Sequence, residues 1–198
     1  VTVNSKPVIP AQAVTICSGA APNFIPTNNP PTTIVPSGTT YMWTSPTVTG
    51  GVTGGAAQAT PQTSVNQVLS NPTNTAQTAT YTVTPIGPNC TGLSFTLTVT
   101  LNPTPSITTM TATTCSGTAF GSTPINITNG IVPSGTTYSW GLPSVTGGLS
   151  GGAIGSGASS IIGTLSNSTG VSQTATYTVT PLSGTCTGNT FTVFITVD

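Results

Sequence analysis

The stretch QTATYTVTP at residues 77–85 decides the fold class, because its side chains alternate between apolar and hydroxyl-bearing types. Ala79, Tyr81 and Val83 would face one side of a strand, and the four Thr residues would face the other. A period of two indicates a half-buried β-strand. Residues 95–101 alternate in the same way, and the Pro- and Gly-containing segment between the two runs is typical of a turn. We therefore expect a β-hairpin.

The second half of the chain repeats the first. The same nine residues recur unchanged at 173–181, and Trp43 has a counterpart in Trp140. The motif VPSGTTY at 35–41 returns at 132–138. Self-similarity at a fixed spacing indicates tandem structural modules.

The repeat also sets the expected domain boundaries. We predict one repeat at residues 5–102 and a second at 103–198. Residues 1–4 resemble residues 99–102, so we expect them to be the tail of a preceding repeat. The chain would then be a window from a longer array, or a subunit that joins others end to end.

Each repeat reads as an antiparallel β-sandwich of the immunoglobulin-like class. Tyr41 and Trp43 share one face of an earlier strand, and no segment has a convincing helical period. About seven short strands per repeat fit such a sandwich. The Gly and Pro content would also suit a disordered chain, but the regular apolar alternation favours a folded one.

Charge is nearly absent, and this excludes several classes of function. The chain has one Lys, one Asp, and no Arg, Glu or His. Acid–base catalysis needs a titratable group near the working pH, and nucleic-acid binding needs clustered cations. We therefore expect no enzyme, no catalytic residue, no cofactor, no metal site, no nucleic-acid partner and no membrane insertion.

Four cysteines occupy matching positions in the two repeats. Cys17 corresponds to Cys115, and Cys90 corresponds to Cys186. The duplication favours one bridge per repeat, Cys17–Cys90 and Cys115–Cys186. A zinc site is the competing interpretation, but neither paired Cys-x-x-Cys spacing nor His is present. Disulfides would indicate an extracytoplasmic location.

The outward faces of the predicted hairpin are candidate contact surfaces. In the first repeat, hydroxyl side chains would line this face at Thr78, Thr80, Thr82, Thr84, Thr96, Thr98 and Thr100. Thr is also simply a soluble strand former, so a solvated face is one interpretation. Lateral packing between filaments, sugar binding and ice binding are the others. In the second repeat Phe194 takes the outward position of Thr98, which suggests a contact with a neighbouring module or chain.

The combined motifs resemble a known family. PSGTTYxW, VTGGxxGG, QTATYTVTP and CTGxxFT are present in both halves. Together they resemble the PKD-like repeats of giant secreted surface proteins of Bacteroidota, including adhesins associated with gliding motility. The resemblance implies a β-sandwich array exported through the outer membrane, commonly by type IX secretion. It implies display as a stalk, filament or adhesin, and no catalytic residues.

We therefore predict a non-catalytic structural repeat of an extracellular filament, stalk or giant cell-surface adhesin, attached at the outer membrane. Its partners would be neighbouring repeats or subunits of the same fibre. One alternative is an adhesive module that binds glycan or another surface directly. Another is a two-module subunit of a head-to-tail polymer.

Overall fold

The computed structural model describes residues 4–198, which form two compact all-β units. One unit ends at Asn102 and the other comprises Pro103–Asp198. Most of the predicted tail of a preceding repeat, residues 1–3, lies outside the described residues, so that assignment stays a prediction. Within residues 4–198, no helix is long and apolar enough to cross a membrane.

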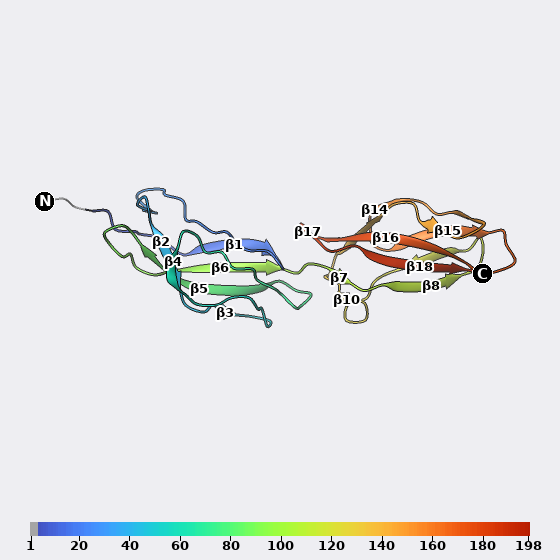
Figure 1. The fold of residues 1–198 in the computed structure, drawn as a ribbon, viewed down its shortest axis with the longest axis horizontal. Helices are drawn as coiled ribbons and strands as arrows, with labels where there is room; N and C mark the ends of the chain where they lie inside the picture. Colours follow the sequence, from blue (N-terminus) through green and yellow to red (C-terminus); the bar gives the residue numbers. More distant parts are fainter. Residues whose placement is uncertain (1–3) are drawn as a thin grey trace. The chain divides into compact units, whose positions relative to one another are not determined.

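The first unit is built around one mixed sheet, shown in blue to green in Figure 1. Its strands are β1 (Gln12–Cys17), β2 (Thr40–Trp43), β3 (Thr47–Val48), β4 (Gln58–Gln62), β5 (Gln77–Ile86) and β6 (Phe95–Asn102). The sheet order is β1-β6-β5-β2-β4, with β3 pairing beside β5. Strand β1 runs parallel to β6, and the other pairs are antiparallel.

The predicted hairpin is confirmed as the antiparallel pair β5–β6. The first strand extends one residue beyond the stretch 77–85, to Ile86. Pro85 pairs with Tyr41 of β2, and its carbonyl accepts a hydrogen bond from the Gly92 backbone N–H at 2.9 Å. The turn therefore begins at Gly87.

A thinner second layer covers the apolar face of the main sheet. In the first unit it is held by isolated bridges, Phe24 to Val65 and Thr53 to Ser70. Val65 and Leu69 of this layer are fully buried against the sheet. The two layers enclose one core, which is the sandwich arrangement that the alternation predicted.

The second unit repeats this plan and adds more regular pairing. Its strands are β7 (Ser106–Ile107), β8 (Met110–Thr114), β9 (Ala119–Ser122), β10 (Gly130–Ile131), β11 (Thr137–Trp140), β12 (Ser144–Val145), β13 (Leu149–Gly151), β14 (Gly155–Ala158), β15 (Ile161–Asn167), β16 (Gln173–Ser183), β17 (Cys186–Thr187) and β18 (Phe191–Val197). The main sheet has the order β14-β11-β16-β18-β8, and β13-β15-β9 forms the second layer. Each unit thus has its own core, and the predicted all-β tandem sandwich is confirmed. It is not purely antiparallel as predicted, because the strand at one edge of each main sheet, β1 or β8, runs parallel to its partner.

The two predicted disulfides are wrong. Cys90 and Cys115 are free thiols, whereas Cys17 and Cys186 are disulfide-bonded. Each predicted bridge would have joined one bonded cysteine to one free cysteine.

The predicted bridges cannot form because the two cysteines of each unit lie near opposite ends of its last strand. We call the end where this strand begins the first pole, and the end where it finishes the second pole. Cys17 pairs with Asn102, the last residue of β6, whereas Cys90 precedes β6 and lies in the turn closed by the Gly87 N–H to Cys90 carbonyl bond. The eight residues of β6 separate the two cysteines by about 23 Å. A disulfide needs Cα atoms within about 7 Å.

The second unit has the same separation. Cys115 follows Thr114, which is paired with Val197 at the end of β18. Cys186 lies near the opposite end of β18, before that strand begins at Phe191, and it pairs with Ser183 at the end of β16. Cys90 and Cys186 therefore mark first poles, and Cys17 and Cys115 mark second poles.

Candidate functional site

The predicted hydroxyl face of the first unit is formed by paired strands β5 and β6. Its cross-strand pairs are Thr78 with Thr100, Thr80 with Thr98 and Thr82 with Thr96. Thr84 lies opposite Met42 of β2, and its hydroxyl is 2.8 Å from that of Ser94. Thr82 and Thr96 are exposed and the others are partly buried.

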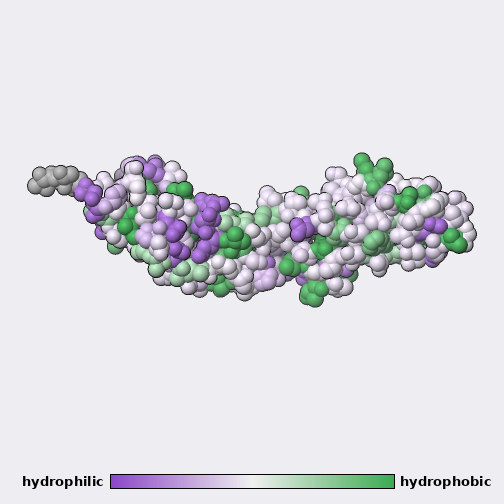
Figure 2. All heavy atoms as spheres, viewed as in Figure 1, coloured by the Kyte–Doolittle hydropathy of each residue, from purple (hydrophilic) through white to green (hydrophobic). Residues whose placement is uncertain are grey.

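This face offers hydrogen bonds without charge. Most of the surface visible in Figure 2 is pale, the colour of residues with intermediate hydropathy such as Thr, Ser and Gly, with green apolar spheres scattered among them. Directly opposed Thr pairs stabilise a sheet and leave hydroxyl groups at its surface. A contact role for this face stays a prediction.

Phe194 interrupts the corresponding face of the second unit. It lies opposite Thr176 on β16 and beside Thr111 on β8, as the register predicts for the counterpart of Thr98. Its side chain is 37% exposed, while its neighbours Val193 and Ile195 are fully buried. An aromatic ring therefore stands among hydroxyl groups on an otherwise polar face.

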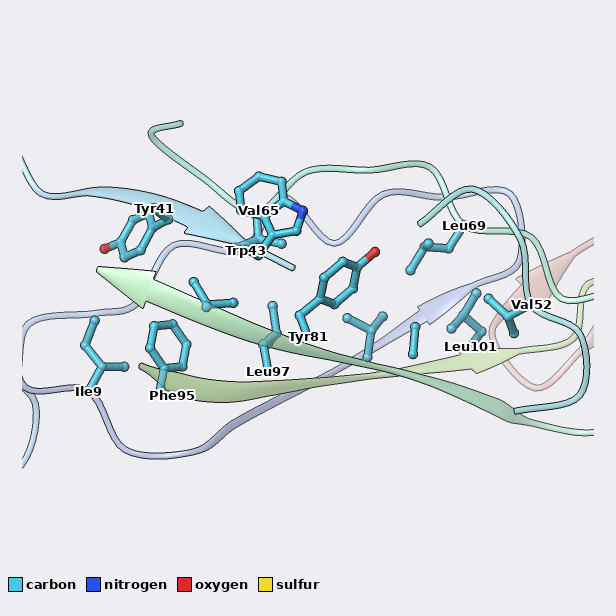
Figure 3. Close-up of a cluster of buried hydrophobic side chains, with 13 residues drawn as sticks. Ile9, Tyr41, Trp43, Val52, Val65, Leu69, Tyr81, Phe95, Leu97 and Leu101 are labelled. Carbon is cyan, nitrogen blue, oxygen red and sulfur yellow. The ribbon is translucent and has the colours of Figure 1, made fainter. Parts of the chain in front are cut away.

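The other aromatic side chains belong to the core. Figure 3 shows Tyr41, Trp43 and Tyr81 inside the cluster of the first unit. The indole N–H of Trp43 donates to the Ala56 carbonyl at 3.0 Å, and that of Trp140 donates to the Ala153 carbonyl at 2.9 Å. Both indoles thus satisfy their polar group internally and do not form an exposed stacking platform.

Burial also controls the tyrosine hydroxyls. Desolvation raises the pKa of Tyr81 to about 12, and it raises the pKa values of Tyr41, Tyr138 and Tyr177. These groups stay protonated at neutral pH, so they can donate hydrogen bonds but cannot act as bases.

Tyr81 and its counterpart Tyr177 differ in their partners. The Tyr81 hydroxyl donates to the Gln67 side-chain oxygen at 3.1 Å, and the same oxygen accepts from the Ala56 N–H at 3.1 Å. The buried Tyr177 hydroxyl has no partner among the described residues. The position that corresponds to Gln67 is Gly163, which supplies no side chain.

Gly163, which stands in place of Gln67, lines a groove in the second unit. The groove has a volume of about 510 Å³ and is lined mainly by Phe120, Trp140, Ile154, Ala158, Ile162 and Gly163. Ile154 and Ile162 are 72% and 57% exposed, so apolar side chains flank an accessible hollow. A Cβ built on Gly163 would lie 3.2 Å from the Tyr177 hydroxyl, which places that hydroxyl next to the groove.

The sequence interpretation missed this groove. The sequence does contain a difference that points to it: Gln67 of the first repeat is replaced by Gly163, 96 residues later, in the second. Recognising it required knowing that Gln67 bonds Tyr81, and only the fold brings these two side chains together.

The charged side chains Lys6 and Asp198 belong neither to the hydroxyl face nor to the lining of the groove. Lys6 lines a hollow with Pro7 and Leu93, and the Asp198 side chain accepts a hydrogen bond from the Ser172 hydroxyl at 2.6 Å. In residues 4–198 no three His, Cys, Asp or Glu side chains come together in a way that could hold a metal ion.

Two solved structures align with this chain at low sequence identity. Human CDH23 EC21-23 is 13% identical over 98% of this chain and 70% of that one, with a TM-score of 0.31. A Bacteroides ovatus mixed-linkage glucan utilization locus protein, SGBP-B, solved with a mixed-linkage heptasaccharide, is 14% identical over 98% of this chain and 48% of that one, with a TM-score of 0.32. This chain spans about half the length of SGBP-B, and TM-scores this low do not bear on function.

The sequence comparisons are more direct. Curated protein sequences gave no match. The profile of the PKD-like domain family matches residues 14–105 and 112–198, one match in each unit. The chain therefore belongs to the PKD-like domain family and carries two tandem copies of that domain.

Proposed function

We propose that this chain is a pair of non-catalytic structural repeats from an extracellular filament, stalk or giant cell-surface adhesin. The resemblance to secreted Bacteroidota surface proteins extends the proposal to outer-membrane display, type IX secretion and a link to adhesion or gliding. The repeats set length and present other parts of the parent protein.

The observation that carries the proposal is the duplication of one complete sandwich with a nearly uncharged surface. Each unit fills its own interior with buried aromatic and aliphatic side chains. A chain with one Lys and one Asp has few groups for catalysis or ionic recognition. Repeated self-contained units are how proteins build length, because each unit needs only its own core and its neighbours.

Immunogold electron microscopy tests this role. Antibodies raised against the 198-residue chain should label filaments or stalks on intact cells that make the parent protein. Inserting one further copy of the repeat pair into the gene should lengthen the labelled structure. Label confined to the cell interior, or an unchanged filament length, would contradict the proposal.

The groove of the second unit supports a second candidate, direct binding of a neutral glycan. The accessible apolar hollow is a packing surface, and the buried Tyr177 hydroxyl next to Gly163 has no partner among the described residues. The first unit has Gln67 at the position of Gly163, so it serves as an internal comparison.

Tryptophan fluorescence tests this candidate, because Trp140 lines the groove. A panel of neutral oligosaccharides should change the emission of the native chain if a glycan binds there. Gly163→Gln places a side chain in the groove and should abolish the change. Preserved amide protection in β16 would show that the variant is folded. No response to any oligosaccharide would remove the candidate and leave the structural role in place.

A further inference from the structure

The free thiols follow a rule that relates the two units. In the first unit the second-pole residue Cys17 is bonded and the first-pole residue Cys90 is free. In the second unit the first-pole residue Cys186 is bonded and the second-pole residue Cys115 is free. Each free cysteine is therefore the counterpart of a bonded cysteine in the other unit.

Cysteines of both poles thus form disulfides in this fold. The free pair again comprises one first-pole and one second-pole cysteine. Cys115 is exposed and Cys90 is partly exposed, so both thiols are open to a partner. Neither can pair with the other cysteine of its own unit, because the length of the last strand separates them.

The positions of the single Lys and the single Asp give a second, independent indication of what pairs with the free thiols. Lys6 lies at the first pole of the first unit, because its neighbour Pro7 packs against Gly87 and Gly92, on either side of Cys90. Asp198 lies at the second pole of the second unit, where its carbonyl accepts from the Ser116 N–H at 2.9 Å, beside Cys115. Lys6 thus lies at the same pole as the free thiol of Cys90, and Asp198 lies at the same pole as the free thiol of Cys115.

We propose that Cys115 of one chain forms a disulfide with Cys90 of a second copy, which joins copies end to end. This inference rests on the proposed structural function and adds a partner and a covalent link to it. Lys6 of one copy and Asp198 of the next attract each other across this junction. The counterpart of Lys6 in the second unit, Thr104, and the counterpart of Asp198 in the first unit, Asn102, are neutral.

Thiol–disulfide exchange with a low-molecular-weight disulfide, oxidised glutathione, forms the bond. The Cys115 thiolate attacks one glutathione sulfur, the glutathione S–S bond breaks, and one glutathione thiolate leaves. The Cys90 thiolate of the second copy then attacks the Cys115 sulfur and releases the second glutathione. Two protein thiols lose two electrons and two protons, and one glutathione disulfide becomes two thiols.

The test incubates the native chain with oxidised glutathione, blocks residual thiols, and separates the products without reductant. We expect a ladder at multiples of 19.5 kDa that dithiothreitol collapses. Mass spectrometry of a chymotryptic digest should find the Cys115 peptide joined to the Cys90 peptide.

Single variants provide the matched controls. Cys90→Ser and Cys115→Ser should each stay monomeric alone, and a mixture of the two should give a dimer and nothing larger. Lys6→Glu should slow ladder formation about two- to fivefold at low ionic strength. Added salt should remove that difference.

Three results would overturn the inference. They are a wild-type chain that stays monomeric with both thiols still reactive, a ladder that persists in either single variant, and linked peptides of the Cys90–Cys90 or Cys115–Cys115 type. If filaments are labelled by the antibody but no ladder forms, the cross-link is refuted and the structural role stands.

Discussion

Replacing Tyr81 and Tyr177 by Phe, one at a time, should change the stability of the two units in opposite directions. Both rings are fully buried at matching positions, and Phe keeps their shape. The substitutions therefore remove a hydroxyl without opening a cavity. The environment of that hydroxyl decides the sign of the effect.

The magnitudes follow from the hydrogen bonds. Tyr81→Phe removes the bond to Gln67, whose oxygen still accepts from the Ala56 N–H, so no buried acceptor is left unpaired. The unfolding free energy of the first unit should fall by about 1 kcal/mol. Tyr177→Phe removes a buried hydroxyl without a partner among the described residues, and the second unit should gain about 1 kcal/mol.

Native-state hydrogen exchange with mass spectrometry can read the two units separately in the intact chain. Amides of β5 report on the first unit, and amides of β16 report on the second. A net difference of about 2 kcal/mol between the variants corresponds to roughly a thirtyfold difference in exchange. If Tyr177→Phe destabilised its unit as much as Tyr81→Phe does, the Tyr177 hydroxyl would have a partner such as water, and the reasoning would be refuted.

Three further predictions concern pH and backbone geometry. Circular dichroism melts of the oxidised chain should give nearly the same Tm from pH 4 to pH 9, because few groups titrate there; a large shift would contradict this. Above pH 10 tyrosines ionise in the unfolded chain before Tyr81 ionises in the folded chain, because burial raises the Tyr81 pKa to about 12. The stability present below pH 10 should therefore be lost as the pH rises toward 12, by up to about 3 kcal/mol for Tyr81. Gly54→Ala should destabilise the first unit by about 3 kcal/mol in the β5 exchange assay, because φ is +94° and a Cβ would overlap the Val68 carbonyl. The control Gly19→Ala, with φ at +89° and no atom within 4 Å, should cost only about 1 kcal/mol, and equal effects would show that steric overlap is not the cause.

Local patterns in the chain were sufficient to predict the architecture. The alternation at residues 77–85 and 95–101 identified the hairpin β5–β6 and its buried face, because a strand's side chains alternate by geometry alone. The offset between the copies identified two units, and the same periodicity placed Phe194 outward. These features depend on neighbours in sequence or on exact repetition, so no tertiary information was needed.

Pairings between distant residues depended on the tertiary structure. Repeat symmetry suggested one disulfide per unit, yet the length of β6 and of β18 places the two cysteines of each unit at opposite poles. Likewise, only the packing of the second layer on the sheet brings Gln67 to Tyr81 and leaves Tyr177 without that partner. The sequence by itself determined which residues share a strand and a face. The fold alone decided which of them meet across the unit, because that depends on strand lengths and on how the layers stack.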